Sequence, residues 1–105
     1  TACLRLIEWG AKIVVLKQGD SGCRVFTRKS TFDVPGFKVN AIDPTGAGDC
    51  FDAGFISGYL DNLPLYETAR LANAMGALAA SRLGPMEGTF SLKEVMNFIK
   101  KQRRD

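Results

Sequence analysis

The chain has 105 residues, of which 46% are hydrophobic and 24% charged, a balance typical of an ordinary globular domain and not of a disordered or fibrous chain. Its formal net charge of +3 comes from the last six residues, because the first 99 carry ten basic and ten acidic side chains. A basic tail is not the basic stripe across a fold that nucleic-acid binding requires. The absence of histidine excludes Ser-His-Asp triads, Cys-His dyads and zinc sites built on imidazole.

The chain has three cysteines, an odd number without C-x-x-C spacing: Cys3, Cys23 and Cys50. We therefore expect neither a disulfide framework nor a thiolate metal site. We also expect the protein to be located in a reducing cytoplasm. The sequence contains no apolar run of about 18 residues and no signal-peptide pattern, so we expect no membrane partner. Because the basic charge is confined to the tail, we also expect no nucleic-acid partner. The chain opens at Thr1, inside a predicted helix, which predicts the remainder of a longer chain. If strands are missing, an exposed sheet edge or a partner is to be expected, a homodimer being one option.

The first half of the chain predicts a helix followed by strands. Residues 2–9 form a helix that ends at Gly10, with Trp9 packing at its end. Residues 13–16, Ile-Val-Val-Leu, do not alternate, which is the pattern of a strand buried on both faces, as in a parallel sheet. A turn at 19–22 precedes an alternating pair of strands at a sheet edge and one further strand, over residues 23–28, 31–34 and 38–42.

The second half is helical. Helices are predicted over Ala47–Leu60, over Leu65–Leu83, and from a capping box at residues 91–94 onward. Gly54 and Gly58 permit close backbone contact between the first helix and a neighbour. Together the elements predict part of an α/β layered structure.

The segment Asp43 to Asp49, Asp-Pro-Thr-Gly-Ala-Gly-Asp, lies at a predicted junction into a helix. Its two glycines let backbone N–H groups converge, and the positive end of the following helix adds to them, so the segment predicts an anion hole for phosphate. Asp49 has two interpretations: a capping acid that interacts with the helix dipole, or a general base beside the bound phosphate. A P-loop is disfavoured, because its G-x-x-x-x-G-K spacing is absent.

Three further side chains have competing interpretations. Asn73 shares a helix face with Ala69, Ala77 and Ala80; this small-residue face could accept a flat purine, or it marks a close helix–helix contact. Asp52 is expected to be a solvated acid near the helix start. Cys50 is either a thiol whose pKa is lowered by the helix N-terminus or a small buried hydrophobe.

Residues 43–55 resemble the second signature of the PfkB-type carbohydrate kinases, which have a ribokinase-like fold. Residues 14–22, Val-Val-Leu-Lys-Gln-Gly-Asp-Ser-Gly, also resemble the family's strand and glycine turn before the nucleotide site, and residues 72–84 resemble its adenine-side helix and loop. Gln18 departs from the pattern, since the family has an apolar residue there. The similarity runs in order over nearly the whole chain and implies a Rossmann-like layered α/β fold.

The resemblance implies ATP-dependent transfer of the γ-phosphoryl group to a sugar hydroxyl, with Mg²⁺ sharing charge neutralisation. Asp49 matches the family's catalytic base, and the backbone amides of Gly46, Ala47 and Gly48 match its anion hole. The implied nucleotide-binding residues are Lys17, Gly19, Gly22, Asn73 and Ala77. Family members also bind a monovalent cation such as K⁺, which implies a site at Asp43 and Thr45 with oxygens from the Gly84 loop.

The family's chain is much longer than this one, so residues 1–105 resemble its C-terminal, nucleotide-binding part, without the sugar-binding residues. We therefore expect the isolated chain to be inactive as a kinase. Two alternatives remain: a nucleoside kinase of the same fold, and a nucleotide-binding module without catalysis.

Overall fold

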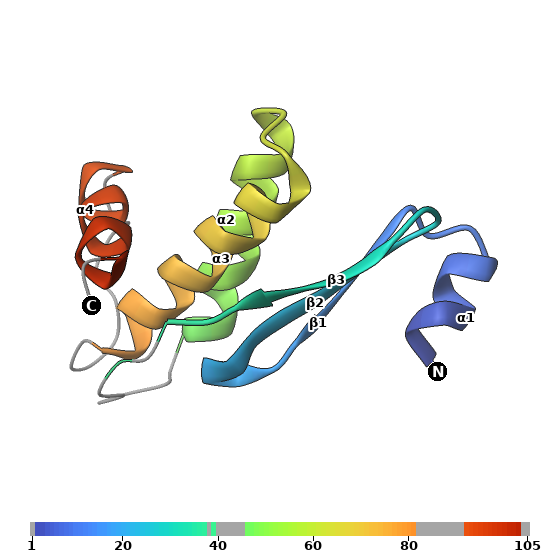
Figure 1. Ribbon diagram of the computed structural model, residues 1–105, viewed down its shortest axis with the longest axis horizontal. Coiled ribbons are helices and arrows are strands. Elements are labelled where there is room, and N and C mark those ends of the chain that lie inside the picture. The colour runs from blue at the N-terminus through green and yellow to red at the C-terminus, as the bar shows by residue number, and fades with distance from the viewer. Residues whose placement is uncertain (1, 38, 40–45, 82–91, 104–105) are drawn as a thin grey trace.

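The computed structural model describes residues 2–37, 39, 46–81 and 92–103 (Figure 1). A three-stranded sheet runs through the middle of the molecule, with helices at both ends and along one face. The elements, in chain order, are α1 (Ala2–Glu8), β1 (Ile13–Lys17), the 3₁₀ turn η1 (Gly19–Ser21), β2 (Gly22–Thr27), β3 (Thr31–Pro35), α2 (Ala47–Leu60), α3 (Leu65–Ala80) and α4 (Leu92–Arg103). The predicted α/β class is therefore confirmed.

The sheet has the order β1-β2-β3, and both pairs of strands are antiparallel. The predicted hairpin over residues 23–34 is confirmed, and its turn is closed by the Thr27 hydroxyl, which accepts hydrogen bonds from the Lys29 and Ser30 amides. The prediction of a parallel strand buried on both faces is wrong for β1 in the described part of the chain. Leu16 is 43% exposed, because α2 and α3 cover only the other face of the sheet.

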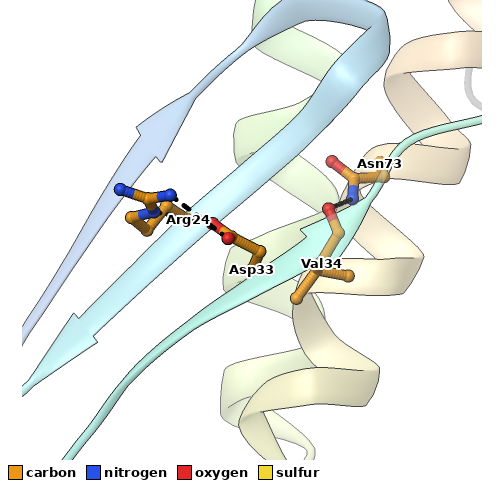
Figure 2. A network of polar contacts seen from close by, with 4 residues as sticks. All are labelled: Arg24, Asp33, Val34 and Asn73. Carbon is orange, nitrogen blue, oxygen red and sulfur yellow. Dashed lines mark hydrogen bonds and ion pairs between the residues drawn. The ribbon is translucent and has the colours of Figure 1, made fainter.

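That covered face holds the main core. Alternate residues of β2 and β3 point toward the helices, as the period of two in a strand requires. They pack with residues of α2 and α3 in one buried cluster: Cys23, Val25, Val34, Phe51, Ala69 and Ala72. On the opposite face, the Arg24 guanidinium donates two hydrogen bonds to the Asp33 carboxylate, at 2.6 and 3.2 Å (Figure 2).

Close contact between α2 and α3 at Gly54 and Gly58 is confirmed. A Cβ placed on Gly54 would lie 2.7 Å from Met75 Sδ and 3.1 Å from Ala72 Cα. One on Gly58 would lie 3.0 to 3.3 Å from atoms of the buried Thr68. The missing side chains therefore set the distance between the two helices, and with it the position of the α2 N-terminus over the sheet.

The two terminal helices pack at opposite ends of the molecule (Figure 1). The helix α1 contacts β1 and β2 through a buried Ile7. It ends at Glu8, two residues before Gly10, whose left-handed backbone (φ +111°) is the conformation predicted for the glycine after the helix. The prediction that Trp9 packs is wrong: it is 78% exposed, because Ile7 occupies the face toward the sheet. At the other end, α4 buries Val95 and Ile99 in a cluster with residues of α3.

Several predicted features lie outside the described residues: most of the strand at 38–42, the last residues of the helix to Leu83, and the start of the capping box at Ser91. Within the part that the structure describes, no helix is long and apolar enough to cross a membrane.

Candidate functional site

The first backbone amides of α2 have no partner within the helix. The helix begins after Gly46, whose left-handed backbone (φ +82°, ψ −5°) favours glycine, and which has no side chain to cap the helix. The Cys50 amide donates the first helical hydrogen bond, to the Gly46 carbonyl at 3.0 Å. The amides of Ala47, Gly48 and Asp49 precede that bond, so they have no partner within the helix and form its positive end.

A pocket of about 370 Å³ lies beside this helix end. Its walls come from the end of β1, the 3₁₀ turn η1 and the start of β2, from Gly36, Phe37 and Val39, and from the start of α2 and the second half of α3. Seven residues of the predicted site line it: Lys17, Gly19, Gly22, Ala47, Gly48, Asn73 and Ala77. Three segments far apart in the sequence thus meet at one cavity, which is within the size range of small-molecule pockets. Gly46 and Asp49 adjoin it at the start of α2 without lining it.

Gly22 is required by the close approach of β3. A Cβ on Gly22 would lie 2.0 Å from the Val34 carbonyl oxygen and 2.5 Å from the Gly36 nitrogen, and its φ of +105° is unfavourable for any other residue. Gly19 also has a positive φ, +61°, but no atom lies near its missing side chain. The two glycines therefore shape the pocket wall in different ways. Gly22 allows β3 to approach closely, and Gly19 places no side chain at the turn.

Asn73 ties α3 to the end of β3. Asn73 is 7% exposed, and its Nδ2 donates a hydrogen bond to the Val34 carbonyl (Figure 2) and another to the Pro35 carbonyl, each at 3.2 Å. The Asn73 amide nitrogen is therefore engaged within the protein. The helix–helix interpretation was incomplete, since the partner is a strand. A lone amide in a stripe of alanines could have signalled this, because buried side-chain amides are nearly always bonded, most often to backbone.

Beneath Asn73, the Cys23 thiol is fully buried, and burial raises its pKa, an effect that the Asn73 hydrogen bond partly opposes. The Cys50 pKa is also raised, first by burial and then by the charge of Asp49. The interpretation of Cys50 as a thiol activated by the helix N-terminus is therefore wrong. Asp49 itself is exposed, in the first turn of α2.

Among the described residues that line the pocket, Lys17 is the one with a charged side chain. Its ammonium lies 2.7 Å from Asp52 Oδ1 and 5.3 Å from the centroid of the Phe51 ring. Asp52 is 56% exposed, so it is solvated as predicted, but the sequence did not reveal its ion pair with Lys17. The two residues are 35 positions apart in the sequence, and only the packing of α2 on the sheet brings them together.

The predicted cation site, Asp43 and Thr45 with the Gly84 loop, lies outside the described residues. Among the described residues, no group of three or more His, Cys, Asp or Glu side chains could hold a metal ion.

Comparison with known proteins relates this arrangement to one family. A protein from Halopiger xanaduensis described as an ATP-dependent ribose-1-phosphate kinase is 44% identical over 77 residues, which are 73% of this chain and 26% of that protein. An uncharacterised sugar kinase from Archaeoglobus fulgidus is 39% identical over 88 residues, 84% of this chain and 35% of its own. The chain thus spans about a third or less of these relatives.

A solved structure from E. coli, assigned as ribokinase II and determined with ATP and Mg²⁺, superimposes with a TM-score of 0.89 at 39% identity. The match covers 95% of this chain and 32% of that one. The likeness confirms the ribokinase-like fold. The family model described as pfkB family carbohydrate kinase matches residues 1–91, and the chain therefore belongs to the pfkB family of carbohydrate kinases.

Proposed function

We propose that this chain forms the nucleotide-binding part of an ATP-dependent kinase that transfers the γ-phosphoryl group to a sugar hydroxyl. The observation that carries the proposal is a pocket lined by the first residues of α2, whose first-turn amides have no partner within the helix. Membership of a carbohydrate kinase family supports the sugar as acceptor.

The residues that line the pocket offer two kinds of chemistry. Phe37, Val39, Ala77 and Ala80 are apolar and suited to packing on a flat base. The first-turn amides of α2 and the Lys17 ammonium are suited to phosphate, because N–H donors and a helix N-terminus favour anions, so we take this side as the phosphate end of the pocket. We assign Gly46, Ala47 and Gly48 to the anion hole, and Lys17, Gly19, Gly22, Asn73 and Ala77 to the nucleotide site, where Asn73 acts by fixing the wall rather than by donating to the base.

Mg²⁺ enters this proposal with ATP. Hard divalent cations in kinases are held largely by substrate phosphates, water and one or two carboxylates. When bound, Mg²⁺ would neutralise charge on the phosphates.

We propose Asp43 and Thr45 as the site of K⁺. Comparing the ATP affinity in potassium buffer with that in tetramethylammonium buffer tests this assignment.

Asp49 is our candidate for the general base. It is exposed and adjoins the amides that would hold the phosphates, so an acceptor hydroxyl could reach it. There it would take the hydroxyl proton as the oxygen attacks the γ-phosphorus. In a longer chain that includes the acceptor site, Asp49→Asn should lower kcat by about 10² or more while ATP affinity stays within a few-fold. Near-unchanged kcat would reassign Asp49 to capping the helix.

The isolated chain should bind ATP or ADP without sugar-dependent turnover. A nucleotide-binding module without catalysis would give the same result, so the kcat of Asp49→Asn in the longer chain separates that alternative, and the choice of acceptor separates the nucleoside kinase. Titration calorimetry of the 105-residue chain with ATP, followed by ADP-release assays with hexoses, pentoses and nucleosides, tests it. Binding without turnover is the expected result. Robust phosphorylation of a nucleoside but of no sugar would favour the nucleoside kinase, and absence of ATP binding would refute the nucleotide site.

A further inference from the structure

Lys17 and Asp52 form a contact that joins two walls of the pocket region. Lys17 ends β1, and Asp52 lies in the second turn of α2; the ammonium and the carboxylate oxygen are 2.7 Å apart. The two side chains are 45% and 56% exposed. An ion pair so open to water contributes little to stability, so folding alone gives it no evident role.

The ammonium is held against one face of α2. Gly48, Phe51 and Asp52 are spaced i, i+3 and i+4, so they share that face. The ammonium lies 5.3 Å from the Phe51 ring centroid, and it is the nearest atom to a Cβ placed on Gly48, at 3.7 Å. Two attractive contacts, one ionic and one cation–π, therefore keep the charge beside the first turn of the helix.

This placement matters because a lysine side chain is flexible. Its ammonium is a point charge on a four-carbon stem with about 2 kcal/mol of rotamer entropy, so without a partner it would spread over many positions. The ammonium carries three N–H donors, and one carboxylate oxygen at 2.7 Å uses one of them. The other two are the donors that an anion at the α2 N-terminus would use.

We propose that Asp52 is a positioning residue that holds the Lys17 ammonium at the phosphate end of the pocket. The inference rests on the proposed nucleotide site. Asp52 also has an opposite effect, since its negative charge repels phosphate. The proposal requires the positioning effect to outweigh that repulsion. In a chain without the Lys17 charge, only the repulsion would remain.

Five forms of the full 105-residue chain test this: wild type, Asp52→Asn, Asp52→Glu, Lys17→Met and the Lys17→Met/Asp52→Asn double variant. Titration calorimetry measures Kd for ATP and for adenosine, which has the base but no phosphate. Asp61→Asn is the matched control, because it removes one exposed acid at the far end of α2. Melting curves confirm that each variant folds.

We expect Asp52→Asn to weaken ATP binding about threefold to fivefold, the scale of one exposed ion pair, with adenosine affinity unchanged. Asp52→Glu keeps the negative charge, so it should bind ATP nearly as tightly as the wild type. Asp61→Asn should bind ATP with unchanged affinity. In the Lys17→Met background, Asp52→Asn should not weaken ATP binding further and should slightly strengthen it.

Two results would overturn the inference while leaving the nucleotide site in place. The first is ATP affinity that is unchanged or tighter in Asp52→Asn while Lys17→Met weakens it, which would make Asp52 a bystander or a competitor for the ammonium. The second is equal weakening by Asp52→Asn with and without Lys17, which would assign the effect to something other than positioning. If the wild-type chain bound no ATP, the proposed function would fail, and this inference with it.

Discussion

Replacing Asn73 with alanine tests whether this residue holds the pocket together or only lines it. The change removes two hydrogen bonds of 3.2 Å to the Val34 and Pro35 carbonyls in a setting where Asn73 is 7% exposed. Each buried hydrogen bond contributes about 1 kcal/mol net, and a carbonyl left without a partner adds to the loss. Alanine's better helix propensity returns roughly 0.5 kcal/mol.

The expected net loss in the free energy of unfolding is therefore about 2 kcal/mol, which lowers Tm by roughly 8 to 16 °C in a domain of this size. Thermal and urea unfolding followed by circular dichroism measure it. Asn97→Ala, at an exposed position of α4, is the matched control and should change stability by less than about 0.5 kcal/mol. A loss for Asn73→Ala no larger than the control's would refute the argument that Asn73 ties α3 to β3.

Three more predictions concern the pocket and its surroundings. Gly22→Ala should cost several kcal/mol or prevent folding, because its Cβ would lie 2.0 Å from a carbonyl oxygen; a Tm within a few degrees of wild type would contradict this close approach. Gly48→Val should leave Tm nearly unchanged, because the position has ordinary helical geometry and a Cβ there would make only an ordinary contact, 3.7 Å from the Lys17 ammonium, but it should weaken ATP binding by blocking the first-turn amides; an undiminished ATP-induced rise in Tm would remove Gly48 from the phosphate site. Because burial raises the Cys23 pKa in the folded state, stability from the protonated thiol is present below the unfolded pKa of about 8.5 and is lost as pH rises above it. The difference in unfolding free energy between wild type and Cys23→Ala should therefore shrink from pH 8 to pH 10, and a constant difference would argue against a buried, protonated thiol.

Local patterns predicted the parts of the fold that depend on local physics. The boundaries of α2 follow from a glycine before the helix and an Asn-Leu-Pro break after it, and the structure places the helix at the predicted residues, 47–60. The hairpin follows from alternation interrupted by a polar turn. Gly54 and Gly58 were predicted to permit close contact, because glycines four apart on a helix leave a groove along one face.

The features that were missed depend on which surfaces meet. An apolar run such as residues 13–16 is the same whether one or both faces of the strand are covered, so the exposure of Leu16 could not be read from it. Trp9 was misplaced for the same reason, since its size predicts burial only if a partner surface faces it. The Lys17–Asp52 pair required the position of α2 on the sheet, which no local pattern contains.

The site was predicted in part. The motif at residues 43–49 located the helix N-terminus, and its glycines indicated exposed amides, because that inference needs only backbone conformation. The pocket beside it brings together seven predicted residues. The hydrogen-bonding role of Asn73 was not predictable, since its partners are carbonyls of a strand 38 and 39 residues earlier in the chain.

The central claim, that phosphates bind at the α2 N-terminus, is tested most directly by amide chemical shifts in an NMR titration of the isotopically labelled chain. ATP should shift the amides of Gly46, Ala47, Gly48 and Asp49 together with those of Gly76 and Ala77 in α3, whereas adenosine should shift only the α3 amides. ATP-induced shifts confined to other regions, such as α1 or the exposed face of the sheet, would contradict the account.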